Sequence, residues 1–358
     1  MKVIPIVLTL PANLPAFFIM HILENFSLRN YNTFGIDVKA RYFTELTHQK
    51  EIPELLNHIN DVKVSYMILS GGSNVLFTQN FSGLMVHINL KGITKLSESE
   101  DFVLVKVMGG EDWEDFVQYC LNNNWGGVEN LTLIPGKVGT SPMQNIGAYG
   151  VELKDVFHEL EALEVRTGKI HFFNKSDCRF GYRNSFFKQE GKGQFIILSV
   201  TFKLTQKNHF VNTGYGAIKH ELKQRKIDNP GIHDIADVVR FIRTSKLPDP
   251  KDLGNAGSFF KNPVIPVEQY LELKKKFPEI IAYPDKSEDM KIAAGWLIEN
   301  AGWKGYRVGD AGVHKLQALV LVNYGKASGS EVLQLSENIR RSVMNRFEIN
   351  LEPEVNVL

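Results

Sequence analysis

The sequence is poor in the features that define several protein classes. Only two of its 358 residues are cysteine, Cys120 and Cys178, and neither belongs to a Cys-x-x-Cys pair, which excludes a disulfide framework. Sparse cysteine suits a reducing compartment, so we predict a cytoplasmic location. Long basic runs are missing and the net charge is only +1, from 41 basic and 40 acidic residues. Nucleic acid and anionic membranes are therefore poor candidate partners.

Two common nucleotide-binding motifs are also missing. Neither GxxxxGK[ST] nor GxGxxG occurs, so the usual P-loop and dinucleotide-binding fingerprints are not indicated. Internal repeats and low-complexity segments are absent as well. His314 and Gln317 lie close in sequence but lack a third ligand with metal spacing. We therefore expect no metal, and a structural, hydrogen-bonding role for His314.

The first 19 residues are apolar with a single lysine, but prolines and an asparagine interrupt them. They are too broken for a transmembrane helix, and no small-x-small cleavage site follows. We expect an extension without function over residues 1–19, with a signal peptide or a membrane role as the alternatives. The remaining length, with 43% hydrophobic residues overall, suggests two or three domains with sizeable cores.

Short apolar runs dominate the first half of the chain and predict a mixed α+β structure. Thr167-Gly168 between two apolar runs predicts a hairpin over residues 163–173. In residues 112–122, helical spacing relates Trp113, Phe116, Tyr119 and Cys120. The other expected strands are 66–69, resumed at Val75, then 103–107 and 195–204.

The second half is more helical. Residues 234–242 begin this region, Pro266 can open a helix through Leu273, and residues 291–301 form another. The strongest pattern covers residues 331–347, with Ser330 as a candidate cap. Its expected buried face is Val332, Leu335, Ile339, Val343 and Phe347. Residues 351–355 are expected to be extended.

Two glycine-rich loops are candidates for binding phosphate. One is Ser70-Gly-Gly-Ser-Asn74, and the other extends from Ile134 to Gly150. Glycine backbones with nearby hydroxyls and amides can form N–H nests that bind phosphate without a lysine. Apolar and aromatic residues between the glycines could line a planar ring. The alternative is a pair of glycine-rich turns in a β-rich domain.

The decapeptide Gly254–Pro263 is the most informative segment. It places the Ser258 hydroxyl after two glycines and before two aromatic anchors, Phe259 and Phe260, which Lys261 and Asn262 then follow. This combination is typical of a positioned, reactive hydroxyl more than of a solvated loop. The alternative role for Ser258 is a helix cap or an ordinary loop hydroxyl.

Three charged residues are further candidates. Arg183, within Cys178–Ser185, could hold a carboxylate through two hydrogen bonds, or could be a solvated arginine on a turn. Lys246, just before Pro248, could hold a phosphate, or could be a surface lysine at a helix end. Glu354 could act as an acid with a raised pKa if it is buried, or could belong to an exposed acidic tail.

Taken in order, these segments resemble the UDP-N-acetylenolpyruvoylglucosamine reductase family, also called UDP-N-acetylmuramate dehydrogenase, of bacterial peptidoglycan synthesis. The resemblance covers about residues 32–355 and includes a tyrosine, Tyr215, like the mobile tyrosine of one subgroup. Each segment is weak alone, but nine in the same order are specific. They are residues 32–37, 71–77, 134–152, 180–185, 246–250, 254–263, 293–298, 314–321 and 351–355.

The resemblance implies an α+β fold with a two-lobed FAD-binding domain of the vanillyl-alcohol-oxidase/PCMH type and a C-terminal α+β substrate-binding domain. The expected divisions are 20–90 and 91–218 for the two FAD-binding lobes, 219–346 for the substrate domain, and 347–358 for a strand returning to the active site. It also implies a monomer that binds a UDP-sugar and NADPH, and neither nucleic acid nor membrane.

The implied reaction reduces UDP-N-acetylglucosamine enolpyruvate to UDP-N-acetylmuramate, with NADPH reducing bound FAD and the flavin passing a hydride to the vinyl carbon. Arg183 and Glu354 would stabilise charge on the substrate carboxylate, and Ser258 would protonate the adjacent carbon. The expected substrate contacts are Tyr182, Tyr215, Lys246, Asn262 and Gln317. The expected FAD contacts are Gly71, Gly72, Ser73, Asn74, Thr140, Ser141, Asn145, Ile146, Gly147 and Tyr149.

The chain departs from the family at Asn356, where relatives commonly carry an arginine whose loss could weaken cofactor binding or packing near Glu354. Two other function classes remain open. One is a flavin or nucleotide-sugar binding protein without catalysis, against which the presence of Ser258, Arg183 and Glu354 argues. The other is an oxygen-using flavin oxidase, which the lack of a histidine or cysteine in a covalent-flavin setting disfavours.

Overall fold

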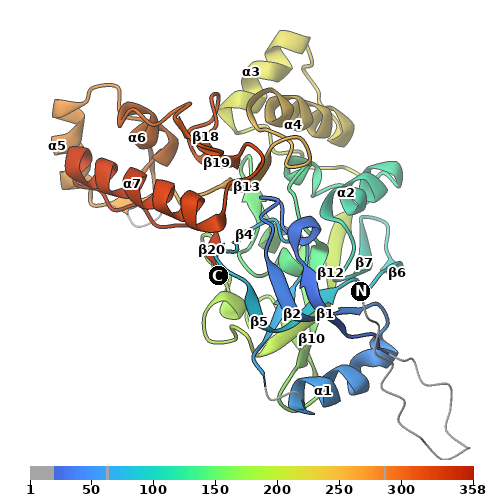
Figure 1. Ribbon diagram of the computed structural model, residues 1–358. Coiled ribbons are helices and arrows are strands. Elements are labelled where there is room, and N and C mark those ends of the chain that lie inside the picture. Colours follow the sequence, from blue (N-terminus) through green and yellow to red (C-terminus); the bar gives the residue numbers. More distant parts are fainter. Residues whose placement is uncertain (1–19, 62–63, 286–287) are drawn as a thin grey trace, which may run out of the picture. The chain divides into compact units, whose positions relative to one another are not determined.

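The computed structural model describes residues 20–61, 64–285 and 288–358 (Figure 1). The extension expected over residues 1–19 lies outside the described residues. The chain forms two compact units. Unit 1 contains the residues up to Phe26, Lys39–Gly71 and Phe81–Arg243, and unit 2 contains Ser27–Val38, Gly72–Asn80 and Thr244–Leu358. Each unit combines helices and strands, which confirms the α+β class.

Unit 1 contains a four-stranded sheet in which two strands run parallel to a central neighbour. Helix α1 (Ile52–Asp61) lies in the sequence between β2 (Lys39–Leu46) and β3 (Tyr66–Leu69), which both pair in parallel with β5 (Phe81–Ile88). The buried side chains of this region form one apolar cluster that includes Leu46, Leu55 and Leu84. In sheet order the strands are β1 (Leu23–Ser27), β2 (Lys39–Leu46), β5 (Phe81–Ile88) and β3 (Tyr66–Leu69).

A five-stranded antiparallel sheet forms the second layer of unit 1. Its order is β11 (Ile170–Asn174), β10 (Phe157–Glu164), β12 (Phe195–Thr205), β7 (Phe102–Met108) and β6 (Ile93–Glu98). The predicted strands and hairpin are confirmed, and Gly168 has the positive φ of 70° that the hairpin turn requires. Helix α2 (Trp113–Asn122) buries Trp113, Phe116 and Cys120 as predicted, but Tyr119 is exposed.

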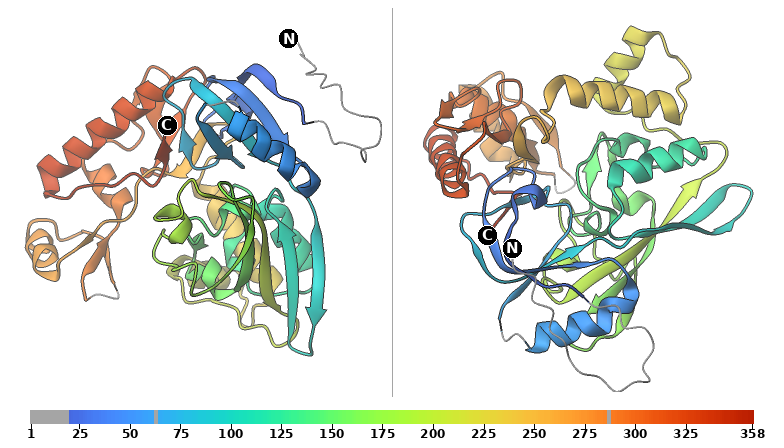
Figure 2. Two further views of the ribbon diagram at one scale, coloured as in Figure 1. Left: turned by 90° about the horizontal axis from the view of Figure 1, so that it is seen from below. Right: turned by 45° about the vertical axis from the view of Figure 1, so that its right-hand side comes forward.

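Two helices at the end of unit 1 share an apolar cluster that includes Leu222 and Val239, and they lie side by side in Figure 1 and in the right-hand view of Figure 2. They are α3 (Gly216–Arg225), which the sequence analysis missed, and α4 (Ile232–Lys246). Helix α3 was missed because its apolar stripe is weak, with only Ile218 and Leu222 buried. Helix α4 ends two residues before Pro248, as predicted, because the residue before a proline disfavours helical backbone.

Unit 2 is built on a four-stranded sheet of order β13 (Gly254–Ser258), β19 (Val320–Asn323), β18 (Ala311–Val313) and β17 (Arg307–Val308). A smaller sheet holds β14 (Val264–Ile265), β16 (Met290–Ile292) and β15 (Ala282–Pro284). The C-terminal strand β20 (Asn356–Val357) pairs in parallel with β4 (Val75–Leu76). The helices are α5 (Val267–Lys276), α6 (Ala294–Asn300) and α7 (Gly329–Phe347).

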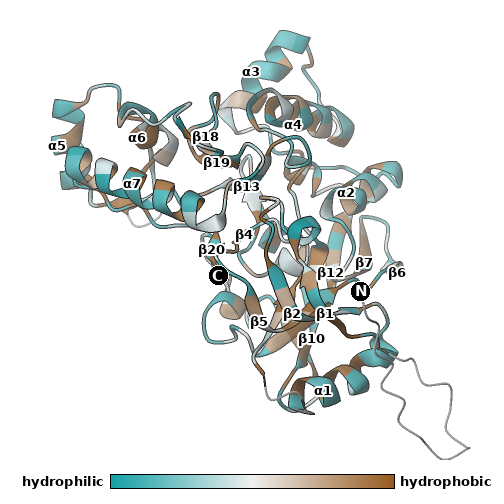
Figure 3. Cartoon of the chain, viewed as in Figure 1, coloured by the Kyte–Doolittle hydropathy of each residue, from teal (hydrophilic) through white to brown (hydrophobic). Residues whose placement is uncertain are grey.

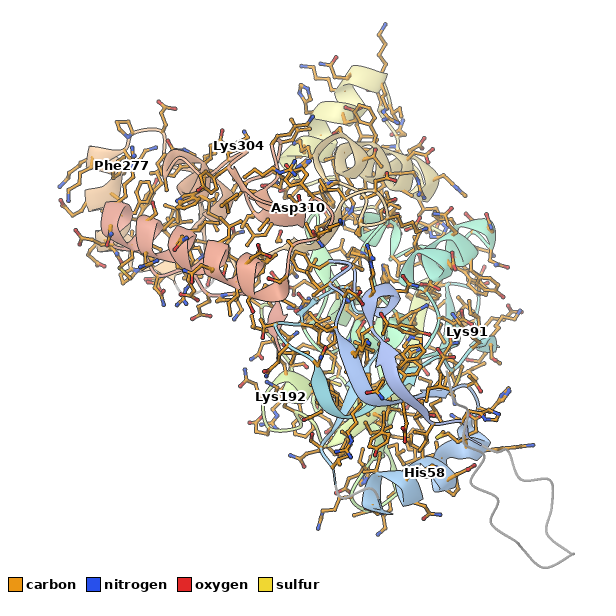
Figure 4. All side chains as sticks on the ribbon, viewed as in Figure 1. His58, Lys91, Lys192, Phe277, Lys304 and Asp310 are labelled. Carbon is orange, nitrogen blue, oxygen red and sulfur yellow. The ribbon has the colours of Figure 1, made fainter. Side chains whose placement is uncertain are left out.

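Helix α7 buries the face that its spacing predicts, and hydrophobic and hydrophilic residues alternate along it (Figure 3). Its last core residue, Phe347, packs edge-to-face on Phe277, labelled in Figure 4, with ring centroids 4.9 Å apart. The predicted cap is wrong: Ser328, not Ser330, caps the helix. Ser328 accepts the Glu331 N–H while the Glu331 side chain returns to the Ser328 backbone.

Two further helix boundaries differ from prediction. Residues 291–301 do not form one helix, because Met290–Ile292 is strand β16 and α6 begins at Ala294. Pro266 is the residue before α5, which continues to Lys276. The remaining short elements are β8 (Gly147–Ala148), β9 (Val151–Glu152), and the 3-10 turns η1 (Arg29–Tyr31), η2 (Gln49–Glu51), η3 (Glu129–Leu131), η4 (Val138–Thr140), η5 (Leu153–Asp155) and η6 (Phe186–Lys188).

Candidate active site

A β-bulge displays Ser258 at the end of β13. Its pairing with β19 shifts register between Asn255 and Ser258, and Gly257 takes a φ of 70°. Asn255 stabilises this geometry, because its buried Oδ1 accepts the Gly257 N–H at 2.9 Å. Bulges re-aim side chains at functional sites. Ser258 is exposed while the next two residues, Phe259 and Phe260, are buried anchors, as the decapeptide predicted.

The segment that carries Glu354 lies beside the strand that carries Ser258. The Glu354 N–H donates to the Phe259 carbonyl at 2.8 Å, and Phe260 forms a bridge with Pro353. The two flanking glutamates differ, because Glu352 is mostly exposed and pairs with Lys261 at 3.0 Å, whereas Glu354 is half-buried. Unit 2 therefore brings two of the three predicted catalytic residues onto neighbouring backbone segments.

Asn74, a predicted cofactor contact, joins the same segment. Its Nδ2 donates to the Glu354 carbonyl at 3.2 Å. In return, the Asn356 backbone and side chain both donate to the Asn74 carbonyl at 3.0 Å. Asn356, where we expected an arginine from the resemblance, thus contributes to the pairing of β20 with the loop before β4.

Asn262 and Gln317 each contact the start of α6. The Asn262 Oδ1 accepts the Ala294 N–H at 3.0 Å, and the Gln317 Oε1 lies 3.2 Å from where a Cβ on Gly295 would stand. Asn262 therefore uses its carbonyl oxygen on the backbone, which leaves its amide N–H groups as the donors for a ligand. Lys246 is exposed at the end of α4.

Arg183 anchors the loop that contains β8 in unit 1. It adopts a φ of 51°, and its guanidinium donates to the Gly147 carbonyl at 2.7 Å. Exposed Tyr182 lies against it, with the guanidinium carbon 5.6 Å from the ring centroid. Buried Asn145 ties the same loops together through Nδ2 to the Gly181 carbonyl at 3.2 Å. Arg183 is thus half-buried and oriented, which is more than the solvated alternative requires.

The first glycine loop has glycine where no other residue fits. A Cβ on Gly71 would lie 2.9 Å from the Gly136 Cα, so the two glycine loops are in backbone contact within unit 1. Gly72 has a φ of 59°, and a Cβ there would lie 2.0 Å from the Tyr31 carbonyl oxygen in unit 2. The Ser70 hydroxyl is buried without a hydrogen-bond partner in the described part of the chain.

The second glycine loop is fixed by its own hydroxyls. The Thr140 and Ser141 hydroxyls donate to the Lys137 and Val138 carbonyls at 2.7 Å each, and the Ile146 N–H donates to the Ser141 carbonyl. A cofactor with a diphosphate fits this region, because nests of backbone N–H groups bind phosphate without a lysine. The Ser70 hydroxyl, which has no partner among the described residues, is a further donor. The donor set therefore fits FAD.

Tyr149 ends this loop in a cluster that the sequence did not reveal. Its ring meets Tyr215 edge-to-face, with centroids 5.1 Å apart and an interplanar angle of 83°. Its hydroxyl hydrogen-bonds Arg243, and burial raises the pKa of Tyr149. Arg243 escaped notice because it lies far along the sequence from Tyr149, in a helix with no glycine motif.

His314 hydrogen-bonds through its backbone, because its N–H donates to the Val320 carbonyl at 2.9 Å. It is buried at the end of β18, yet its Nδ1 has no hydrogen-bond partner in the described residues. Burial lowers the pKa of His314, so the neutral ring is favoured. Residues 20–61, 64–285 and 288–358 hold no group of three or more metal-ligating side chains.

Two parts of the chain match known protein families. Residues 40–174 match the FAD binding domain family, so the fold and the glycine loops define a flavin-binding protein. Residues 249–358 match the C-terminal domain of UDP-N-acetylenolpyruvoylglucosamine reductase.

The full-length comparisons specify the family. The chain is 50% identical to a UDP-N-acetylenolpyruvoylglucosamine reductase of Flavobacterium johnsoniae, over 95% of this chain and 100% of that protein. It is 47% identical to the Pseudomonas syringae reductase over 94% and 99%. The chain therefore belongs to the UDP-N-acetylenolpyruvoylglucosamine reductase family. The Thermus caldophilus reductase structure, at 24% identity, shares its fold with a TM-score of 0.63 over 95% of this chain and 99% of that one.

Proposed function

We propose that this protein is an FAD-dependent reductase that uses NADPH to convert UDP-N-acetylglucosamine enolpyruvate into UDP-N-acetylmuramate for peptidoglycan synthesis. Membership of the reductase family across nearly the whole chain supports the reaction. The observation that carries the assignment of roles is the bulged strand that displays Ser258 beside the segment of Glu354.

FAD, when bound, supplies two-electron hydride chemistry between the nicotinamide and the enol ether. The residues that would hold it are Gly71, Gly72, Ser73, Asn74, Thr140, Ser141, Asn145, Ile146, Gly147 and Tyr149. The backbone N–H groups of the two glycine loops are suited to phosphate, whereas the Thr140 and Ser141 hydroxyls stabilise the loop itself.

Proton transfer and charge stabilisation would come from three residues, Ser258, Arg183 and Glu354. Arg183 holds the substrate carboxylate through its guanidinium, and Glu354 stabilises the charge that develops there with a hydrogen bond. The Ser258 Oγ then gives its proton to the carbon next to that carboxylate. A serine hydroxyl is a weak acid, so this transfer requires a strongly basic, enediolate-like acceptor.

Five residues would recognise the nucleotide sugar. Lys246 is an exposed cation at the end of α4, suited to a phosphate. Asn262 and Gln317 offer amide groups at the start of α6. The remaining two, Tyr182 and Tyr215, present exposed rings from unit 1.

Composition supports the proposed location and assembly. The near-neutral charge and the two free, buried cysteines suit a cytoplasmic monomer that binds neither nucleic acid nor membrane. In the described part of the chain, every helix is too short or too polar to cross a bilayer. The four-part division at residues 90, 218 and 346 also stays a proposal.

Replacing Ser258 tests the proposed chemistry. In Ser258→Ala, we expect NADPH to reduce the flavin at a rate within about twofold of wild type, whereas reoxidation by the enolpyruvyl sugar slows by about 10²–10⁴-fold, the range for a lost proton donor. Stopped-flow flavin absorbance measures both half-reactions. The matched control is Ser330→Ala, a serine of the same unit, which should change neither.

Two results would contradict the proposal. Equal slowing of both half-reactions would make Ser258 a structural residue. Reoxidation of the reduced wild-type flavin by air, with no acceleration by the enolpyruvyl sugar, would indicate an oxidase.

A further inference from the structure

A buried asparagine outside the predicted site joins two of its loops. Asn130, in η3, is only 1% exposed. Its Nδ2 donates to the Tyr149 carbonyl at 3.1 Å and to the Asn212 carbonyl at 2.9 Å. Both protons of one amide therefore bind carbonyls from loops that are separated by about sixty residues. Its Oδ1 has no hydrogen-bond partner in the described residues, so the link depends on the two donated bonds.

Asn212 makes the link reciprocal. Its Nδ2 donates to the Gly150 carbonyl at 3.0 Å, and its Oδ1 accepts the Gly214 N–H at 2.9 Å. Consecutive carbonyls of one loop, at positions 149 and 150, are thus bound by two different asparagines. We call the Asn130 and Asn212 side chains with these bonds the asparagine clamp.

The clamp acts on backbone that regular structure does not hold. No helix or strand covers residues 206–215, between β12 and α3, and Phe210 within them is 89% exposed. On the other side, Tyr149 adopts a φ of 51°, a strained conformation for a residue other than glycine. Both segments therefore depend on specific contacts for their positions.

The clamp lies on the two loops that carry Tyr149 and Tyr215. Tyr149 is a predicted cofactor contact and Tyr215 a predicted substrate contact, and their rings meet edge-to-face at 5.1 Å. Such a contact is weak and alone holds a loop poorly. Four hydrogen bonds, of which three join the two loops to each other or to Asn130, supply the constraint that the ring pair lacks.

We propose that Asn130 and Asn212 are positioning residues that favour the placement of Tyr215 against Tyr149, so that the loop of this tyrosine is already ordered when the substrate binds. The proposal rests on the proposed function for the identity of the substrate. Neither asparagine needs to touch a ligand. Loss of the clamp frees the loop of Tyr215, and the nucleotide sugar must then order that loop when it binds, which weakens binding more than it slows the chemistry.

Two variants break the clamp from opposite sides. Asn212→Ala removes the bonds to Gly150 and Gly214 at a half-buried loop position, where misfolding is a small risk. Asn130→Leu keeps the size of the buried side chain and removes both donated bonds. The matched control is Asn123→Ala, which loses only a local bond to the Tyr119 carbonyl at the exposed end of α2.

The first readout needs no turnover. Chymotrypsin is added to the FAD-loaded proteins, and cleavage after Phe210 is followed by mass spectrometry. Since each variant loses two hydrogen bonds, we expect cleavage about tenfold faster than in wild type, with the control unchanged. Unchanged cleavage in both variants would overturn the clamp.

The second readout separates positioning from a general loss of structure. We expect the KM for the enolpyruvyl UDP-sugar to rise about tenfold, with kcat and the rate of flavin reduction by NADPH within about twofold of wild type. An unchanged KM, or an equal fall of kcat and flavin reduction, would overturn the positioning role. If wild type fails to turn over the sugar, the proposed function fails, while the cleavage comparison still tests the clamp.

Discussion

Among single residues, Glu129 is the clearest case of a charge that packing perturbs. It is 2% exposed, and its carboxylate accepts the Gly127 N–H at 2.6 Å. Burial raises the pKa of Glu129 above its ordinary value, and the backbone hydrogen bonds oppose this shift without cancelling it. The folded protein thus binds a proton at Glu129 more tightly than the unfolded chain.

This sign predicts a pH dependence of stability. A raised folded pKa gives a contribution that is fully present below the unfolded pKa and is lost as pH rises through the folded pKa. We therefore expect the unfolding free energy of wild type, minus that of Glu129→Gln, to fall in urea titrations as pH rises above about 4, the ordinary range of a glutamate. The glutamine can still accept the Gly127 N–H, so the comparison isolates the charge.

Glu100→Gln is the control for this prediction, because the Glu100 side chain is 81% exposed and should give a nearly flat difference. A difference for Glu129→Gln that rises with pH would show that hydrogen bonding to the ionised form outweighs burial.

The residue types of the site could be predicted from the sequence, but their partners could not. The two glycine loops, Ser258 and Glu354 stood out through local patterns. Asn130, Asn212 and Arg243 did not, because each acts on a loop distant in sequence and has no local motif. Only the fold gives these ordinary polar residues a site-related role.

Among the elements, α7 shows how two similar signals compete. Ser328 and Ser330 both precede the apolar stripe, and we expected Ser330 to cap the helix. Ser328 does so because Glu331 lies three residues after it and completes a reciprocal capping box. The Ser-x-x-Glu spacing was available in the sequence and would have decided between the two.

The cap can be tested by paired substitutions. Ser328→Ala should lower the unfolding free energy by about 1 kcal/mol, the usual value for a lost N-cap. Ser330→Ala should cost less than about 0.5 kcal/mol, because Ser330 is exposed and makes one bond, to the Thr78 carbonyl. Urea unfolding measures both, and an equal or reversed ranking would contradict the assigned cap.

Element types were predicted well where periodicity was long and poorly where it was short. The face of α7 and the strands around residues 103–107 and 195–204 needed only their own spacing. Residues 290–292 became a strand because both β14 and β15 pair with them, a choice that local sequence does not encode. Helix α3 was missed because two buried residues make too weak a stripe.

At the scale of the whole molecule, the reactivity of the two buried cysteines can be used to measure unfolding. Cys120 and Cys178 are free thiols with no exposed surface. Burial raises the pKa of Cys178 to about 12 and raises that of Cys120 well above the ordinary thiol value. Since the thiolate is the reactive form, both side chains are protected by burial and by protonation.

We therefore expect a thiol reagent to label the native protein slowly at neutral pH, and to label both thiols at once in denaturant. The measurement is the absorbance of the released aromatic thiol with and without urea. A reducing agent should leave the urea midpoint unchanged, which serves as the control. Rapid labelling of one thiol in the native protein would show that its region opens more readily than its packing indicates.

The sequence by itself determined the family, the α+β class and the residue types of the chemistry, because glycines, capping residues and apolar periodicity act over a few neighbouring positions. The tertiary structure alone decided which polar groups meet. It turned Ser258 outward through a bulge, aligned the Glu354 segment with the adjacent strand, and joined two loops through Asn130. Those contacts arise when segments distant in sequence pack together, so they cannot be predicted from local sequence patterns.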